Sequence, residues 1–126
     1  MPFHVYVIEL DPAVASASAR FRKRNPGMEP GARCFYVGQS YHDPDCRYRQ
    51  HKVCHGKDIR FRCICDARAG LIAENRSNVY VRKYGLYLRR RLFEGLNPFR
   101  TRKAAEDAEA RLAKSLKAEG HGVWWA

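Results

Sequence analysis

Glu109 is a carboxylate set in the apolar stripe of the last helix that the sequence predicts. On a helix of 3.6 residues per turn, Leu112 and Leu116 point within about 20° of Ala105, and Glu109 falls on or beside the same side. A carboxylate that faces a core costs roughly several kcal/mol unless it is paired or bound to a cation. Glu109 therefore either pairs with an arginine at the edge of the stripe or serves as a metal ligand. One carboxylate, together with phosphate oxygens and waters, is a common Mg²⁺ site.

Arg47 and His51 are four residues apart, which places them one turn apart on the same face of a helix. The sequence Asp43-Pro44-Asp45 marks the start of that helix, because aspartate caps, proline suits the first helical position and an acidic first turn complements the dipole. We therefore predict a helix over residues 44–52. Arginine is permanently charged and binds phosphate through paired hydrogen bonds, so this face suits an anionic ligand.

Tyr6 and Tyr36 lie in two segments rich in β-branched and aromatic residues, which predicts strands over 4–10 and 34–39. The first segment is a nearly continuous apolar run, so we expect it to be buried on both faces. On composition alone, these two tyrosines are explained as well by core packing as by a chemical role.

The rest of the chain predicts the elements that must position these residues. Thr101 caps a helix that runs to about residue 119, and Gly120 ends it. The other expected elements are a loop or short helix with turns over 13–33, a helix over 79–84 with a glycine cap at Gly85, a strand over 86–93 and a short strand over 122–125. The order strand, strand, helix, helix, strand, helix, strand predicts one α+β domain over residues 1–126, with a small mixed sheet flanked by helices.

The charge balance favours a polyanionic partner. Twenty-four Lys and Arg residues face thirteen Asp and Glu residues, for a formal net charge of +11. Nucleic acid is the commonest partner of so basic a chain, and the alternative is a solvated basic surface with no such partner. No apolar run approaches the ~20 residues that span a bilayer, so we expect no membrane partner. The sequence shows no leader and an odd number of cysteines, five, which favours a reducing, cytoplasmic location.

Four ordered motifs resemble those of the GIY-YIG nuclease superfamily. They are Val5-Tyr6-Val7, Tyr36-Val37-Gly38, Arg47-x-x-x-His51 and Ala105-x-x-x-Glu109-x-x-Leu112. The resemblance spans most of the chain, from Tyr6 to Glu109. It implies a three-stranded, mainly antiparallel sheet flanked by helices, and a nuclease that uses one Mg²⁺ or Mn²⁺ ion to hydrolyse phosphodiester bonds.

The resemblance also implies a role for each matching residue. Tyr6 would help to activate the attacking water, and Tyr36 would orient the nucleophile or the phosphate, with the identity of the base left open. His51 would assist proton transfer or phosphate binding, and Glu109 would bind the single metal ion. Tyrosine has an ordinary pKa of about 10, so a phenol acts as a base only where nearby cations lower that pKa.

Three residues are predicted to bind the substrate, and for Arg47 and Gly38 the resemblance implies how. Arg47 would stabilise charge on the scissile phosphate, and Gly38 would permit close approach of the backbone. Lys52, the last residue of the predicted helix over 44–52, is the third candidate.

The chain departs from the family pattern in several places. The first motif lacks the leading glycine and the isoleucine, and no asparagine follows Glu109 in residues 110–126. The long spacing between the tyrosines makes residues 12–33 an expected insertion, whose basic residues could extend a DNA-binding surface. A second expected insertion covers about 53–76.

Cysteines and one histidine gather within twenty residues, at Cys46, Cys54, His55, Cys63 and Cys65. Such a set could hold a tetrahedral structural Zn²⁺, but it contains no C-x-x-C pair. The spacing therefore favours free thiols over zinc.

The sequence thus predicts a metal-dependent nuclease that acts on nucleic acid, with DNA the favoured substrate. No segment reads a base or a 2′-hydroxyl, so DNA and RNA are not separated. The alternative is a nucleic-acid-binding module of the same fold that has lost turnover, as the departures in the first motif would allow.

Overall fold

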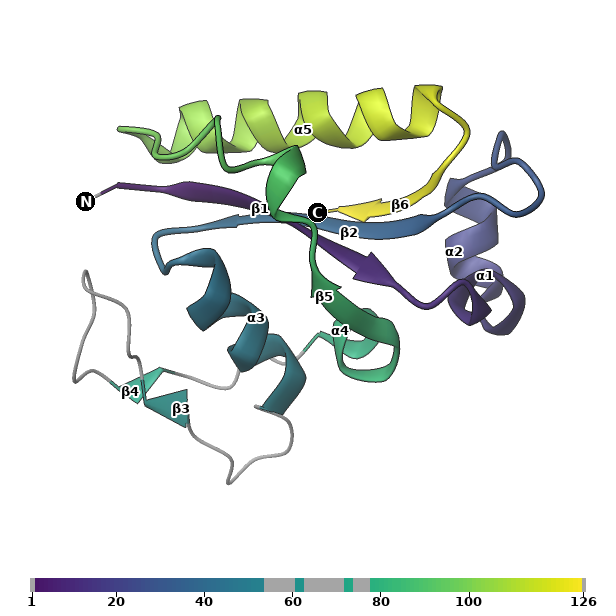
Figure 1. Ribbon diagram of the computed structural model, residues 1–126, viewed down its shortest axis with the longest axis horizontal. Coiled ribbons are helices and arrows are strands. Elements are labelled where there is room, and N and C mark those ends of the chain that lie inside the picture. The colour runs from purple at the N-terminus through teal and green to yellow at the C-terminus, as the bar shows by residue number, and fades with distance from the viewer. Residues whose placement is uncertain (1, 54–60, 63–71, 74–77, 126) are drawn as a thin grey trace.

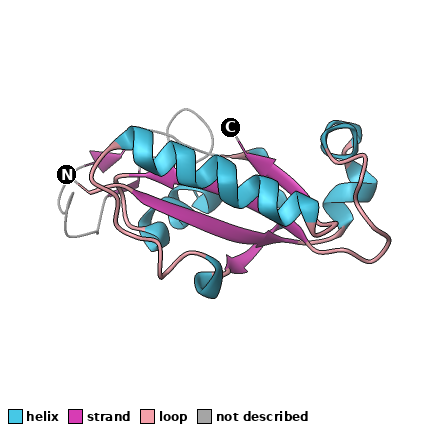
Figure 2. Ribbon diagram, turned by 90° about the horizontal axis from the view of Figure 1, so that it is seen from above, coloured by secondary structure: helices cyan, strands magenta, loops and turns pink. Residues whose placement is uncertain are grey.

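The computed structural model describes residues 2–53, 61–62, 72–73 and 78–125. A four-stranded sheet of order β5-β1-β2-β6 forms the middle layer, with helix α5 along one face and helices α3 and α4 along the other (Figure 1). Seen from above, α5 runs lengthwise over the sheet, roughly along the direction of the long strands (Figure 2). The α+β class predicted from the sequence is confirmed.

The two central strands match the predicted positions. Strand β1 (His4–Leu10) pairs antiparallel with β2 (Cys34–Ser40), and Tyr6 lies opposite Gly38. All residues of β1 after His4 are buried, as the continuous apolar run predicted. Because facing residues of paired strands share a side of the sheet, Tyr6 and Tyr36 project from the same face.

The outer strands make the sheet mixed. Strand β5 (Gly85–Leu88) is antiparallel to β1, whereas β6 (Gly122–Trp125) is parallel to β2. The sheet therefore has one strand more than the resemblance implies. The physical reason is that helix α5 (Arg102–Ala118) connects β5 at one edge of the sheet with β6 at the opposite edge. This crossover connection lets β6 run parallel to β2.

The predicted strand over 86–93 is too long at its C-terminal end. Strand β5 stops at Leu88, and a 3-10 helix follows over Arg90–Leu92. The backbone N–H of Arg89 still donates to Val7, but that of Leu92 turns back to the carbonyl of Arg89. This turn lets Phe93 enter the core, where it is 2% exposed.

The segment expected to be a loop or short helix contains two short helices, α1 (Ala13–Ala17) and α2 (Ala19–Arg24). Ser18 caps α2 by accepting a hydrogen bond from the N–H of Phe21, whose ring is fully buried. Asn25 then ties α2 to β6, because its side chain bonds both the N–H and the carbonyl of Val123.

The remaining helices begin and end close to the predicted limits. They are α3 (Pro44–Val53), α4 (Val79–Tyr84) and α5, which Thr101 caps. Gly120, after α5, has a φ of 92°, a conformation that favours glycine. Gly85, after α4, has a φ of −65°, and glycine is needed there for space, because a Cβ would lie 2.5 Å from the carbonyl oxygen of Val81.

Strands β3 (Phe61–Arg62) and β4 (Ile72–Ala73) form a separate two-stranded sheet. The predicted insertion over 53–76 otherwise lies mostly outside the described residues. Over the described ranges, no helix has the length and apolar character needed to cross a membrane.

Candidate active site

Tyr6, Tyr36 and His51 form a ring cluster on the face of the sheet that α3 covers. The hydroxyl of Tyr6 and Nε2 of His51 are 2.9 Å apart and hydrogen bonded. The Tyr6 and Tyr36 rings are stacked with centroids 6.2 Å apart, and the His51 ring meets Tyr36 edge-on at 5.6 Å. Strand pairing places the two phenols side by side, and α3 delivers the imidazole to them.

Gly38 makes room for this cluster. A Cβ on Gly38 would lie 2.4 Å from the hydroxyl oxygen of Tyr6, so the phenol of Tyr6 fills the space that any other residue would occupy. Seating Tyr6 therefore accounts for the glycine, and the expected contact of Gly38 with substrate stays a prediction.

Arg47 is held by a serine that the sequence reasoning missed. Both Nε and Nη2 of Arg47 donate to Oγ of Ser40, at 3.0 and 2.8 Å. The same oxygen accepts the N–H of His42, and Ser40 is only 4% exposed. Among the residues the structure describes, no carboxylate forms an ion pair with Arg47. The available signal was a hydroxyl at the end of a strand, seven residues before Arg47.

Glu109 points inward from α5, as the helical pattern predicted, and is 6% exposed. Within the described part of the chain, no hydrogen bond or ion pair reaches its carboxylate, so the pairing with an arginine is not observed. Burial, and to a lesser extent the charge of Glu106, raises the pKa of Glu109 to about 7.

Glu9 offers a direct comparison, because it is equally buried, at 6% exposure. Arg33 and Arg89 each place Nη1 on the Glu9 carboxylate, at 3.0 and 2.9 Å. The fold thus neutralises one buried carboxylate with two arginines and leaves Glu109 without such a partner in the described ranges. Hard divalent cations bind oxygen donors such as carboxylates, so the chemistry of Glu109 is compatible with the metal role that the resemblance implies.

The charges of Glu109 and Arg47 both reach the tyrosines. Burial is the main cause that raises the pKa of Tyr6 well above its ordinary value, and the Tyr36 and Glu109 charges add to it, whereas Arg47 lowers it. Burial and Glu109 likewise raise the pKa of Tyr36. The Glu109 carboxylate and the Arg47 guanidinium therefore each lie within electrostatic range of both phenols, and both phenols are neutral at neutral pH.

Lys52 lies apart from the ring cluster. Its ammonium group donates to the carbonyl oxygen of Gly85 at 2.9 Å, at the junction of α4 and β5. The structure thus brings together Tyr6, Tyr36, Arg47, His51 and Glu109 but gives Lys52 a contact within the fold.

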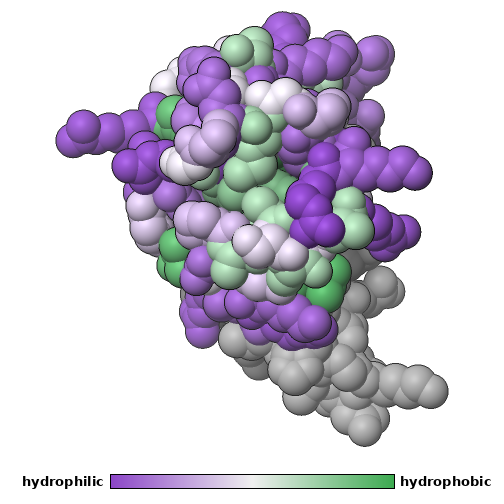
Figure 3. Space-filling model, turned by 90° about the vertical axis from the view of Figure 1, so that its right-hand side faces the viewer, coloured by the Kyte–Doolittle hydropathy of each residue, from purple (hydrophilic) through white to green (hydrophobic). Residues whose placement is uncertain are grey.

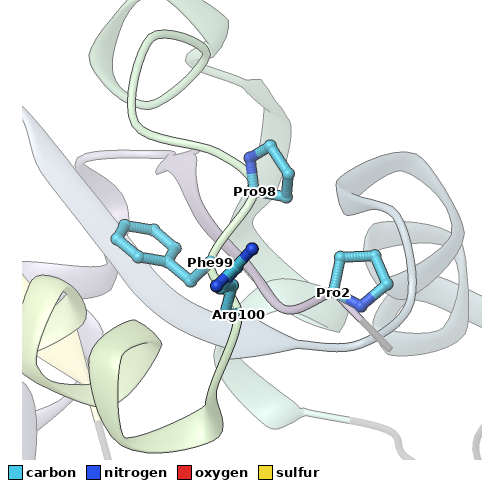
Figure 4. A pocket seen from close by; sticks show the side chains of 4 residues that line it. All are labelled: Pro2, Pro98, Phe99 and Arg100. Carbon is cyan, nitrogen blue, oxygen red and sulfur yellow. The ribbon is translucent and has the colours of Figure 1, made fainter.

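Asn97, which follows the turn over 93–96, is a second positioning residue that the sequence did not reveal. Its side chain donates to the carbonyl of Val5 and accepts from the N–H of Val5, both at 2.8 Å. These two bonds fix β1 directly beside Tyr6. A pocket next to this turn is lined by Pro2, Pro98, Phe99 and Arg100 and includes no predicted site residue (Figure 4).

Only one member of the possible zinc set can be placed. Cys46 is buried, with its sulfur 3.6 Å from Nδ1 of His42. Cys54, His55, Cys63 and Cys65 lie outside the described residues. Across the part of the chain that is described, no three or more His, Cys, Asp or Glu residues gather to hold a metal.

Comparisons with family models, with curated proteins and with solved structures found no match to this chain. The resemblance to the GIY-YIG superfamily therefore stands on the four motifs and on the way their residues converge.

Proposed function

We propose that this protein is a metal-dependent nuclease that hydrolyses phosphodiester bonds in nucleic acid, with DNA the favoured substrate. The observation that carries the proposal is Glu109, a buried carboxylate without an arginine partner in the described ranges, whose charge reaches the Tyr6–His51 pair. In this view β5, β1 and β2 are the three antiparallel strands of a GIY-YIG-like domain, and β6 is an addition to it.

Arg47 binds the scissile phosphate in the proposed mechanism. Its guanidinium is oriented by Ser40 and neutralises the charge that develops on the phosphate oxygens. Glu109 would hold a Mg²⁺ or Mn²⁺ ion, which supplies Lewis-acid stabilisation of the phosphate and of the leaving oxygen.

The hydrogen bond between Tyr6 and His51 suggests how a neutral phenol takes part. Water loses a proton to the Tyr6 oxygen as the Tyr6 proton passes to Nε2 of His51, and the resulting hydroxide attacks phosphorus. Histidine exchanges protons near neutral pH, so the relay avoids a free phenolate, which the raised pKa of Tyr6 disfavours. Tyr36, stacked beside Tyr6, would orient the water or the phosphate.

A cleavage panel tests this function. Single-stranded, duplex and branched DNA, with matching RNA, are incubated with the protein and Mg²⁺ or Mn²⁺, beside the variants Glu109→Ala and Tyr6→Phe. We expect wild-type cleavage that depends on the metal and falls by about 100-fold or more in each variant. No cleavage of any substrate, or equal cleavage by the variants, contradicts the proposal.

A binding module that has lost turnover is the second candidate, favoured by the departures in the first motif and by the raised pKa of both phenols. It predicts binding that weakens steeply with salt, by a log–log slope of about 0.9 per phosphate contact on duplex DNA, without a metal requirement. Metal-dependent cleavage would exclude this candidate.

A further inference from the structure

Helix α2 carries a cluster of basic residues that the proposed catalytic site does not use. Arg20, Arg22, Lys23 and Arg24 are all exposed on this helix of six residues. None of the four pairs with a carboxylate in the ranges that the structure describes. The side chain of Arg22 donates to the carbonyls of Ala15 and Ser16, and that of Arg24 contacts β6, which leaves Arg20 and Lys23 facing solvent.

Arg24, the last residue of α2, contacts the aromatic residues of β6. The Arg24 guanidinium lies 3.9 Å from the ring centroid of Trp124, and its Nη1 donates to the carbonyl of Trp125 at 2.9 Å. Lys117 of α5 donates to the carbonyl of Arg24 at 2.6 Å. A guanidinium stacked on an indole keeps its plane fixed and leaves N–H groups at its edge for a phosphate.

Strand pairing connects this cluster with the ring cluster of the site. Trp124 lies directly beside Tyr36, because β6 is parallel to β2 in that register. Neighbouring strands are about 4.8 Å apart, so Trp124 and Arg24 are one strand away from a candidate catalytic tyrosine. The end of the molecule that carries α1 and α2 presents hydrophilic side chains around a paler, more apolar strip (Figure 3).

We propose that Arg20, Lys23 and Arg24, with Trp124 as support for Arg24, form a second contact surface for the phosphate backbone of the nucleic acid next to the scissile bond. These four residues are called the α2 surface. It contacts phosphates and no base, so it adds affinity without sequence preference. This inference rests on the proposed function. It specifies that the substrate strand runs over α2 as it leaves the site.

A charge-matched pair of variants tests the α2 surface. Arg20→Gln/Lys23→Gln removes two exposed charges three residues apart, and Arg111→Gln/Lys114→Gln removes the same two residue types at the same spacing from the outer face of α5. Binding to duplex DNA is measured over a range of salt concentrations. We expect the α2 variant to bind about tenfold more weakly and to lose up to about 1.8 from the log–log salt slope, with the α5 variant unchanged.

If the wild-type protein cleaves DNA and the two double variants bind DNA with equal log–log salt slopes, the α2 surface is overturned and the proposed function stands. A wild-type protein that neither binds nor cleaves nucleic acid would overturn both. Thermal unfolding of each double variant, expected to match that of the wild type because the side chains are exposed, separates loss of contact from loss of fold.

Discussion

At the scale of single residues, Glu109 is a buried carboxylate without an ion-pair partner among the described residues. Its apolar setting raises its pKa to about 7, and no arginine in the described ranges neutralises it as Arg33 and Arg89 neutralise Glu9. Ionised Glu109 therefore costs stability until a cation reaches it.

The pH dependence of stability follows from this. A raised pKa in the folded state means that the folded protein holds more protons than the unfolded chain between the two pKa values, so stability falls as pH rises from about 4.5 to about 7. In the absence of divalent ions, we expect Glu109→Gln to be more stable than wild type by up to about 3 kcal/mol at pH 8, and nearly equal to it at pH 4. Urea unfolding at both pH values measures this, and a difference that does not change with pH would contradict it.

Gly38 provides a second prediction at this scale. Gly38→Ala places a Cβ against the Tyr6 hydroxyl, so the phenol must move and its bond to His51 must break. We expect a loss of about 1–3 kcal/mol in the free energy of unfolding and a strong loss of cleavage. Gly95→Ala is the control, because nothing lies within 4 Å of a Cβ at that position. Equal behaviour of the two variants would show that Gly38 does not seat Tyr6.

At the scale of elements, the contact between the end of β2 and helix α3 positions Arg47. Ser40→Ala removes the oxygen that accepts both Arg47 donors and the N–H of His42. We expect weaker substrate binding, seen as a KM raised about tenfold, together with roughly 1–2 kcal/mol lower stability. Ser115→Ala, an exposed serine of α5, should change neither. An unchanged KM in Ser40→Ala would show that Arg47 needs no such anchor.

Local patterns predicted most elements because their signals are short in range. The caps and breakers around α3 and α5, and the continuous apolar run of β1, depend on neighbouring residues only. The end of β5 and the direction of β6 depend on what lies across the sheet, and alternating leucines over 86–93 carry no such information.

In the candidate site, too, local sequence patterns predicted some features, and others depend on contacts between distant residues. The inward orientation of Glu109 follows from helical periodicity, and the Arg47 and His51 spacing follows from one helical turn. The roles of Ser40 and Asn97 arise from hydrogen bonds between residues 7 and 92 positions apart, which no local pattern encodes. Substrate binding by Lys52 stays a prediction, and in the structure its ammonium group donates to the carbonyl oxygen of Gly85.

At the scale of the whole molecule, the net charge of +11 and the mixed sheet act together. Strand β6 extends the sheet beyond β2 and places Trp124 beside Tyr36, with the guanidinium of Arg24 over the Trp124 ring. The positive charge would then attract a polyanion toward the site, and salt would shorten the range of this attraction by screening it. We therefore expect cleavage at limiting substrate to fall steeply with ionic strength, more steeply than cleavage at saturating substrate, and equal salt dependence of the two rates would contradict this.

The central claim is that Glu109 holds the metal ion of a nuclease site. The most direct measurement is the single-turnover cleavage rate of DNA as a function of Mg²⁺ concentration, for wild type, Glu109→Gln and the control Glu106→Gln, an exposed acid of the same helix. We predict a saturable Mg²⁺ dependence in wild type and Glu106→Gln, and a rate about 100-fold lower or more in Glu109→Gln at every Mg²⁺ concentration. A Glu109→Gln protein that cleaves with the wild-type rate and Mg²⁺ dependence would contradict the account.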